Sequence, residues 1–235
     1  MKDEKVFYVK PENVVEKSFI LDQSESAHAI HVLRLKKGQR ITLFDGKGRS
    51  YFGKIINIVH DIISGEIEKE VFRIVEENIT INIAPSIIKR KRFENLLEKA
   101  TELGVKKIEP LIMHRSIKKT INMKRCKKII LSAAKQCNRN YLPVLLEPVE
   151  FFSWINKLNS NLLAGLQSTD MHLNNFNFDS KESFHIIIGP EGDFSNEEIK
   201  VMKRSNVKFF TLGNRRLRSE TAMISSISIL NELLS

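Results

Sequence analysis

The chain has 235 residues, 42% hydrophobic and 28% charged, so it can hold one large domain or two small ones with a sizeable core. Its 38 basic and 28 acidic residues give a formal net charge of +10, which favours nucleic acid as a partner because Lys and Arg neutralise phosphates. No apolar run approaches the ~20 residues of a membrane helix, and no apolar signal core follows the N-terminus. We therefore expect a cytoplasmic protein with no membrane partner.

Residues 1–72 have the pattern of a small β-rich domain. Arg40–Phe44 and Tyr51–Val59 flank the turn sequence Asp45-Gly46-Lys47-Gly48, which predicts a hairpin. The other elements predicted here are strands at Val6–Val9 and Ser64–Val71 and a helix from a Ser24 cap to about Leu33. Short strands around one helix predict a small barrel.

After a linker predicted at residues 73–78, residues 79–235 alternate between strand-like and helix-like runs. This alternation predicts an α/β domain with a mostly parallel sheet. The predicted strands are Ile79–Ala84, Lys107–Met113, Asn161–Leu166, Phe184–Ile188 and Lys208–Leu212. The predicted helices span about Lys89–Leu103, about Met123–Asn138, the segment after Ser195, and about Glu220–Leu234.

Two loops near the C-terminus carry most of the functional signal. They lie in Ile186–Phe194 and Thr211–Ala222, and each stretch continues a short apolar strand, breaks at a glycine and leads into a helix. A glycine at the carboxyl end of a buried strand lets backbone approach a ligand, and open α/β sheets bind ligands at that edge. The loops lie about twenty residues apart, so we expect them to form one pocket for a small ligand beside an anionic partner.

The helices that follow both loops begin at predicted caps. Ser195 with Glu198 forms a capping box, and Ser219 is the predicted cap of the last helix. Three arginines precede that helix, where free amides and the helix dipole attract anions, so they favour phosphate contact. They are Arg215, Arg216 and Arg218.

Several classes of site are excluded by spacing. The chain has neither a GxxxxGK[ST] phosphate loop nor a GxGxxG dinucleotide fingerprint, and no nucleophile elbow. Its six histidines and two cysteines show no metal-ligand spacing, so no metal is expected. Cys126 and Cys137 fall in one predicted helix, ~16 Å apart and beyond disulfide reach.

The loop sequences IIIGPEGDFSNEEI and LGNRRLRSETA resemble the paired signature of the RsmE family, the ribosomal-RNA uracil-N3 methyltransferases of the SPOUT (α/β-knot) superfamily. The resemblance extends over nearly the whole chain. Its other segments are His28 with Val32–Leu35, Leu43–Gly46, Lys89, Lys99–Val105, His114–Ser116, Ala133–Gln136, Arg139 and Pro143. The family fold implied is a PUA-like N-terminal domain at 1–72 and a SPOUT methyltransferase domain with a trefoil knot at 79–235.

The resemblance also implies a reaction, a cofactor and partners. S-adenosylmethionine is expected in the knot, and the substrate is expected to be a uridine of 16S rRNA in the small ribosomal subunit. A homodimer is expected, with both subunits contributing to the active site, and no DNA partner. The cofactor-binding residues implied are Leu166, Gln167, Gly189, Pro190, Glu191, Gly192, Leu212, Gly213 and Leu217.

Chemical roles follow from what N3 methylation requires. Arg218 is the candidate for stabilising charge on the uracil carbonyl oxygens, and Glu191 or Glu220 for assisting loss of the N3 proton. The RNA-binding candidates are Arg34, Lys89, Arg92, Arg115, Arg139, Arg215 and Arg216. The chain departs from the family pattern at Asp193, a usual glycine, at Arg216, a usual aliphatic residue, and at Ser219, a usual threonine.

Other functions remain open at this point. A SPOUT ribose 2′-O-methyltransferase acting on rRNA or tRNA would keep the fold and change the chemistry. A non-catalytic RNA-binding protein would keep the PUA-like domain, although two intact glycine loops argue against it. A dinucleotide oxidoreductase is the most distant alternative, because the fingerprint glycines are absent.

Overall fold

A computed structural model describes residues 5–72, 80–157, 161–179 and 182–234, and the predicted linker at 73–78 therefore lies outside the described residues. The chain divides into two compact units. The first comprises Met1–Val75 with Ala134–Leu142, and the second comprises Glu76–Ala133 with Pro143–Ser235. Within the described residues, no helix combines the length and the apolar character needed to cross a bilayer.

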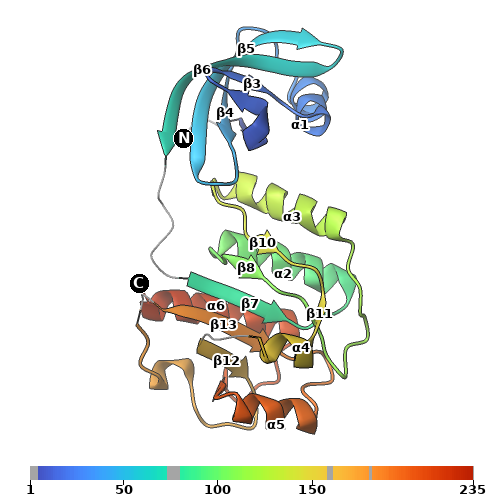
Figure 1. Ribbon diagram of the computed structural model, residues 1–235, viewed down its shortest axis with the longest axis vertical. Helices are drawn as coiled ribbons and strands as arrows, with labels where there is room; N and C mark the ends of the chain where they lie inside the picture. Colours follow the sequence, from blue (N-terminus) through green and yellow to red (C-terminus); the bar gives the residue numbers. More distant parts are fainter. Residues whose placement is uncertain (1–4, 73–79, 158–160, 180–181, 235) are drawn as a thin grey trace. The chain divides into compact units, whose positions relative to one another are not determined.

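The first unit is built on a six-stranded sheet in the order β1-β4-β5-β6-β3-β2 (Figure 1). Its strands are β1 (Val6–Tyr8), β2 (Val14–Val15), β3 (Ser18–Ile20), β4 (Arg40–Phe44), β5 (Arg49–Val59) and β6 (Ile62–Phe72). The predicted hairpin is β4–β5, paired from Arg40↔Lys54 to Phe44↔Ser50. The β5–β6 pairing has two register shifts, and such bulges bend a sheet.

The helical segment of the first unit begins differently from the prediction. α1 (Gln23–Ala27) continues into a π-helical segment, η2 (His28–Val32). Its cap is Asp22, whose Oδ1 accepts from the Glu25 amide at 2.9 Å, so the prediction of Ser24 as the cap was wrong. Ser24 lies inside the helix and its hydroxyl donates to Asp22 at 2.8 Å. Asp is as good a cap as Ser, and the sequence offered both within one turn.

The second unit contains a parallel sheet in the order β10-β8-β7-β13-β12-β14 (Figure 1). Its strands are β7 (Thr80–Pro85), β8 (Lys107–Ile108), β10 (Val144–Leu145), β12 (Asn161–Gly165), β13 (Ser183–Ile188) and β14 (Lys208–Phe210). The helices are α2 (Arg90–Glu102), α3 (Met123–Gln136), α4 (Phe151–Ile155), α5 (Asn196–Arg204) and α6 (Ser219–Leu234). α6 packs against α2, β7 and β13, while α4 packs against α5.

One predicted strand is divided in the structure. The run Lys107–Met113 forms β8 in the large sheet and β9 (Leu111–Ile112), which pairs with β11 (Val149–Glu150) in a separate two-stranded sheet. The break falls at Pro110, which has no amide to donate to a sheet. The short elements α4, β2, β3, β10 and β11 had no clear sequence pattern and were not predicted.

The chain after β14 passes beside the loop that follows β12. Leu166 donates to the Phe210 carbonyl at 2.8 Å, and the Thr211 amide donates to Met171 at 2.7 Å. Gln167 Nε2 then donates to the Asn214 carbonyl at 3.3 Å before α6 reaches β7 and β13. These contacts place the segment after β14 directly beside the segment after β12. The predicted α/β fold, with a mostly parallel C-terminal sheet after a β-rich N-terminal unit, is confirmed.

Candidate functional site

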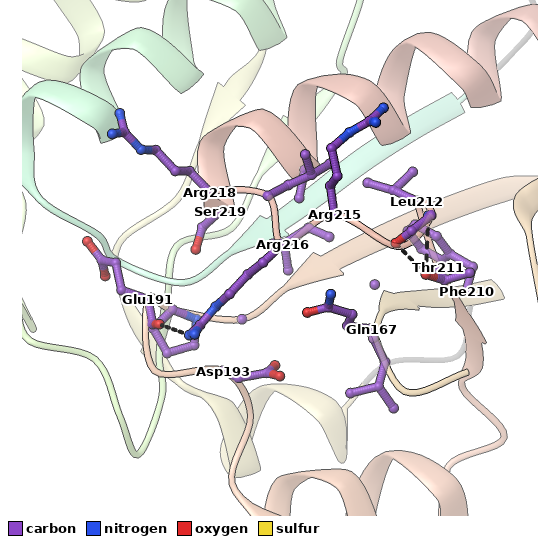
Figure 2. Close-up of a pocket in the computed structure, with 18 of the residues that line it drawn as sticks. Gln167, Glu191, Asp193, Phe210, Thr211, Leu212, Arg215, Arg216, Arg218 and Ser219 are labelled. Atoms are coloured by element: carbon purple, nitrogen blue, oxygen red, sulfur yellow. Dashed lines mark hydrogen bonds between the residues drawn. The ribbon is translucent and has the colours of Figure 1, made fainter. Parts of the chain in front are cut away.

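A cavity of about 340 Å³ lies at the carboxyl ends of β12, β13 and β14. This volume falls within the ~300–1,000 Å³ typical of small-molecule sites. Three loops line it, one after each strand, and Figure 2 shows Gln167, Asp193 and Thr211 around the same space. Gly165, the last residue of β12, packs closely against Ile188. A Cβ added at this position would lie only 2.5 Å from the Ile188 side chain. The two predicted glycine loops therefore belong to one cavity.

The loop after β13 is fixed at its helix end. Asp193 donates its amide to the Pro190 carbonyl at 2.9 Å and has φ +62°, and its Oδ1 accepts from the Phe194 amide at 2.8 Å. The predicted capping box is confirmed: Ser195 Oγ accepts from the Glu198 amide, and Glu198 accepts from the Ser195 amide at 2.6 Å. These hydrogen bonds therefore restrict the conformation of the loop backbone that borders the cavity.

The loop after β14 turns at Gly213, whose φ of +100° favours glycine. Thr211 Oγ1 accepts from the Gly213 amide at 3.3 Å, which closes the turn (Figure 2). α6 begins at Ser219 itself, and the Ala222 amide donates to the Arg218 carbonyl at 2.8 Å. Ser219 is therefore the first helical residue, and its prediction as the preceding cap was wrong. Arg218 occupies that preceding position and lines the cavity.

Arg92 of α2 lies between the two candidate carboxylates. Its Nη1 is 3.6 Å from Glu191 Oε1, and its Nε is 3.6 Å from Glu220 Oε1. The Glu220 side chain is 11% exposed and that of Glu191 24%. Among the described residues, neither oxygen of Glu191 has a hydrogen-bond partner, and Glu220 Oε2 has none either. Arg92 therefore places a positive charge beside two carboxylates that are largely removed from solvent.

Arg216 joins the loops after β13 and β14. Its guanidinium donates to the Glu191 carbonyl at 3.3 Å, and Figure 2 shows it reaching from its own loop to Glu191. Arg115 donates to the neighbouring Gly192 carbonyl at 2.7 Å. Two arginines from different segments thus hold consecutive carbonyls of the same loop, although both side chains are exposed.

The structure brings most of the predicted site residues together. The cavity is lined by eight of the nine predicted cofactor residues, all except Gly192, and by Arg218. Three of the predicted RNA-binding residues, Arg92, Arg215 and Arg216, line it as well. The other lining residues had been given no binding role from the sequence: Gly165, Ile188, Asp193, Phe210, Thr211, Ser219 and Ala222. Three of them end β12, β13 and β14, so the position of the strand ends was a usable signal.

The other RNA-binding candidates lie elsewhere. Lys89 and Arg34 are exposed, and Arg34 has φ +54°. Arg139 lines a small cavity of the first unit with Phe44 and Phe52. Burial lowers the pKa of Arg139 to about 10, because desolvation disfavours its charge. Such burial favours a structural role in this unit, and its RNA contact stays a prediction.

A parallel sheet with a small-molecule cavity at its strand ends, next to arginines and two carboxylates, is suited to hold a small ligand beside an anion. Family comparison identifies the class as RNA methyltransferases. The chain belongs to the RNA methyltransferase domain family, whose model matches residues 75–231. Residues 21–68 match the RNA methyltransferase PUA domain.

Similar proteins cover most or nearly all of the chain. Ribosomal RNA small subunit methyltransferase E of Buchnera aphidicola is 28% identical over 99% of this chain and 96% of its own length. The enzyme of the same name from Rickettsia conorii is 29% identical over 86% of each chain. Two solved structures also match. The Neisseria gonorrhoeae enzyme of that name, bound to S-adenosyl methionine, has a TM-score of 0.90 and 27% identity over 98% of both chains. A putative Legionella pneumophila methyltransferase with bound SAM has a TM-score of 0.89 and 29% identity over 97% of both chains.

Proposed function

We propose that this protein transfers a methyl group from S-adenosylmethionine to N3 of one uridine in the 16S rRNA of the small ribosomal subunit. The observation that carries the proposal is the cavity formed by three loops at adjacent strand ends, in a chain that superposes over 98% of its length on a methyltransferase bound to S-adenosyl methionine. The RNA methyltransferase and PUA family matches support an RNA substrate.

The cavity suits the proposed cofactor in size and polarity. The backbone around Leu166, Gly189 and Gly213 borders the space, and glycine at two of these positions leaves room for a close approach. Asp193 and Glu191 bring carboxylates to a ligand that carries a sulfonium and an ammonium group. We propose that the cofactor-binding residues are those predicted from the sequence and present in the lining, with Asp193 added.

Methylation at N3 requires the protein to remove the N3 proton and to stabilise the negative charge that develops on the uracil. S-adenosylmethionine supplies an electrophilic methyl group when bound. Glu191 or Glu220 accepts the N3 proton, and Arg218 stabilises charge that develops on the uracil carbonyl oxygens. Arg92 holds both carboxylates in place, since it is 3.6 Å from each. Arg92 thus changes from an RNA contact to a positioning residue.

Partners follow from the same proposal. Arg215 and Arg216 at the cavity mouth, with Lys89, Arg115 and Arg34, are the proposed contacts to RNA phosphates. We propose that the enzyme is a homodimer with an active site shared between subunits, and that it acts in the cytoplasm, where ribosomal subunits are found. The domains are proposed to extend over 1–72 and 79–235, as the sequence indicates.

The decisive experiment incubates the protein with methyl-labelled S-adenosylmethionine and small subunits that lack this methyl group. We expect label at N3 of a single uridine of 16S rRNA, mapped by mass spectrometry of nuclease fragments. Arg218→Ala is expected to lower kcat by about 10²-fold or more, as loss of a charge-stabilising donor does. Label in a ribose would instead establish the 2′-O-methyltransferase alternative, and cofactor binding without transfer would indicate a binding protein.

A further inference from the structure

The positive charge of this chain is concentrated in one segment. Between Pro110 and Leu146 there are nine of the 38 basic residues and none of the 28 acidic ones. The rest of the chain therefore carries 29 basic and 28 acidic residues and is almost balanced. The net charge of +10 is a property of this segment, which contains α3 and the loop before it.

Four of the nine basic residues are hydrogen-bonded, paired with a carboxylate or buried within the protein. Arg115 donates to the Gly192 carbonyl, and Arg125 pairs with Glu94 at 2.9 Å. Lys135 pairs with Glu25 at 2.8 Å within the first unit, and Arg139 is largely buried there. Five lysines remain, all exposed and without an acidic partner among the described residues: Lys118, Lys119, Lys124, Lys127 and Lys128. We call these five the lysine surface.

The lysine surface is ordered by α3. Lys124, Lys127 and Lys128 have the i, i+3, i+4 spacing that places side chains on one helix face. The opposite face is buried through Cys126, Ile130 and Ala133. The three lysines are therefore fixed together on the solvent side, and Lys118 and Lys119 precede them in the same unit.

Other helices of the second unit balance their cations. α5 places Glu197 and Glu198 in its first turn and Lys203 with Arg204 in its last. In α2, Lys99 pairs with Glu98 and Glu102. Five uncompensated lysines repel one another, so a solubilising role alone does not explain their grouping. An anionic partner compensates that repulsion.

We propose that the lysine surface binds the phosphate backbone of the substrate RNA away from the target uridine. Lysine is a flexible point charge, which suits phosphates and reads no base edge, so this surface adds affinity and orientation without sequence specificity. The inference rests on the proposed function, because the RNA is that of the methylated subunit. It adds a second anchoring region to the arginines at the cavity mouth.

The test compares Lys124→Ala/Lys127→Ala/Lys128→Ala with a control triple, Lys157→Ala/Lys200→Ala/Lys203→Ala, which removes three exposed lysines elsewhere in the same unit. Equilibrium binding of the small subunit is measured between 50 and 300 mM KCl, together with methyl transfer at saturating subunit. Removing three phosphate contacts should lower the slope of log K against log salt by about two to three, and weaken binding at 150 mM by about tenfold or more.

We expect the control triple to keep both the wild-type slope and the wild-type kcat. An unchanged slope in the α3 triple would overturn the inference while wild-type methylation still upheld the proposed function. If the α3 triple lost binding to anionic vesicles but kept subunit binding, the surface would serve a membrane and the inference would also fall. Absence of methyl transfer by the wild-type protein would count against the function itself.

Discussion

Asp193 adopts a backbone conformation that usually belongs to glycine. Its φ of +62° costs an L-residue roughly 1–2 kcal/mol, although Asp and Asn bear this region better than most. The Asp193 carboxylate offsets part of that cost by accepting from the Phe194 amide at 2.8 Å. This explains how the chain tolerates an aspartate where the family resemblance leads one to expect glycine. It also leaves a negative charge at the cavity.

That charge should distinguish the methyl donor from its product. Asp193→Asn keeps an oxygen for the Phe194 amide and removes the charge. S-adenosylmethionine carries a sulfonium that S-adenosylhomocysteine lacks, so we expect the substitution to weaken the donor by about two- to fivefold and the product less, as a charge pair partly screened by solvent would. Titration calorimetry with both ligands at low salt measures the ratio. Equal losses for the two ligands would contradict an electrostatic role for Asp193.

Arg92 is a second residue whose position decides its role. As a positioning residue for Glu191 and Glu220, Arg92→Ala should lower kcat by about 10- to 100-fold, the scale of losses from small misplacements in active sites. KM for the small subunit and its salt dependence should stay unchanged. Arg92→Lys retains one charge without the fork that spans both carboxylates, so it should restore part of the activity.

A double-mutant cycle with Glu220→Gln tests the contact directly. If Arg92 acts through the carboxylates, Arg92→Ala should cost less in the Glu220→Gln background than in the wild type. Arg90→Ala is the matched control, since Arg90 is an exposed cation of the same helix that pairs with Glu94 at 3.7 Å. A raised KM with an unchanged kcat in Arg92→Ala would return this residue to RNA binding.

At the scale of elements, one buried carboxylate ties the start of α5 to a distant loop. Glu198 is fully buried, and its two oxygens accept from the Ser195 amide at 2.6 Å and from the His114 amide at 2.8 Å. Glu198→Ala would leave both amides without a partner, so it should lower the free energy of unfolding by about 3 kcal/mol or more. Glu197→Ala, one residue away and exposed, should cost less than about 1 kcal/mol. Urea denaturation measures both, and similar losses would remove the argument for the His114 tie.

The sequence predicted the start of α5 and the end of α2 well, because the signals for a helix end lie within a few residues of it. The capping box joins residues three apart, and Gly104, with φ +84°, ends α2 where the pattern placed it. The division of Lys107–Met113 into β8 and β9 depends on which strand lies next to each piece. The same is true of Glu198 and His114, since nothing local indicates a partner 84 residues away. Contacts between residues far apart in the sequence could therefore not be predicted from it.

At the scale of the whole molecule, the candidate site likewise combines residues that local signals predict with contacts that they do not. Most cavity residues were predictable because they follow glycines at strand ends, and the chain itself carries those signals. The pairing of Arg92 with Glu191 and Glu220 joins α2 to the loop after β13 and to the start of α6, about a hundred residues later or more, so charge alone suggested RNA for Arg92. Charge alone suggested RNA for Arg139 as well, and its burial was not visible in the sequence.

The proposed dimer gives the last prediction. One apolar face of α6 is core, with Met223, Ile227 and Leu230 fully buried. A second apolar pair on this helix, Ile229 and Leu233, is about 40% exposed and spaced i, i+4, so it offers a hydrophobic contact to another subunit. Ile229→Glu/Leu233→Glu should convert a dimer to monomers in analytical ultracentrifugation and reduce methyl transfer if both subunits form the active site. Phe152→Glu, which charges an equally exposed apolar position on α4, should leave the dimer intact. A dimer that survives the α6 pair would place the interface on another face.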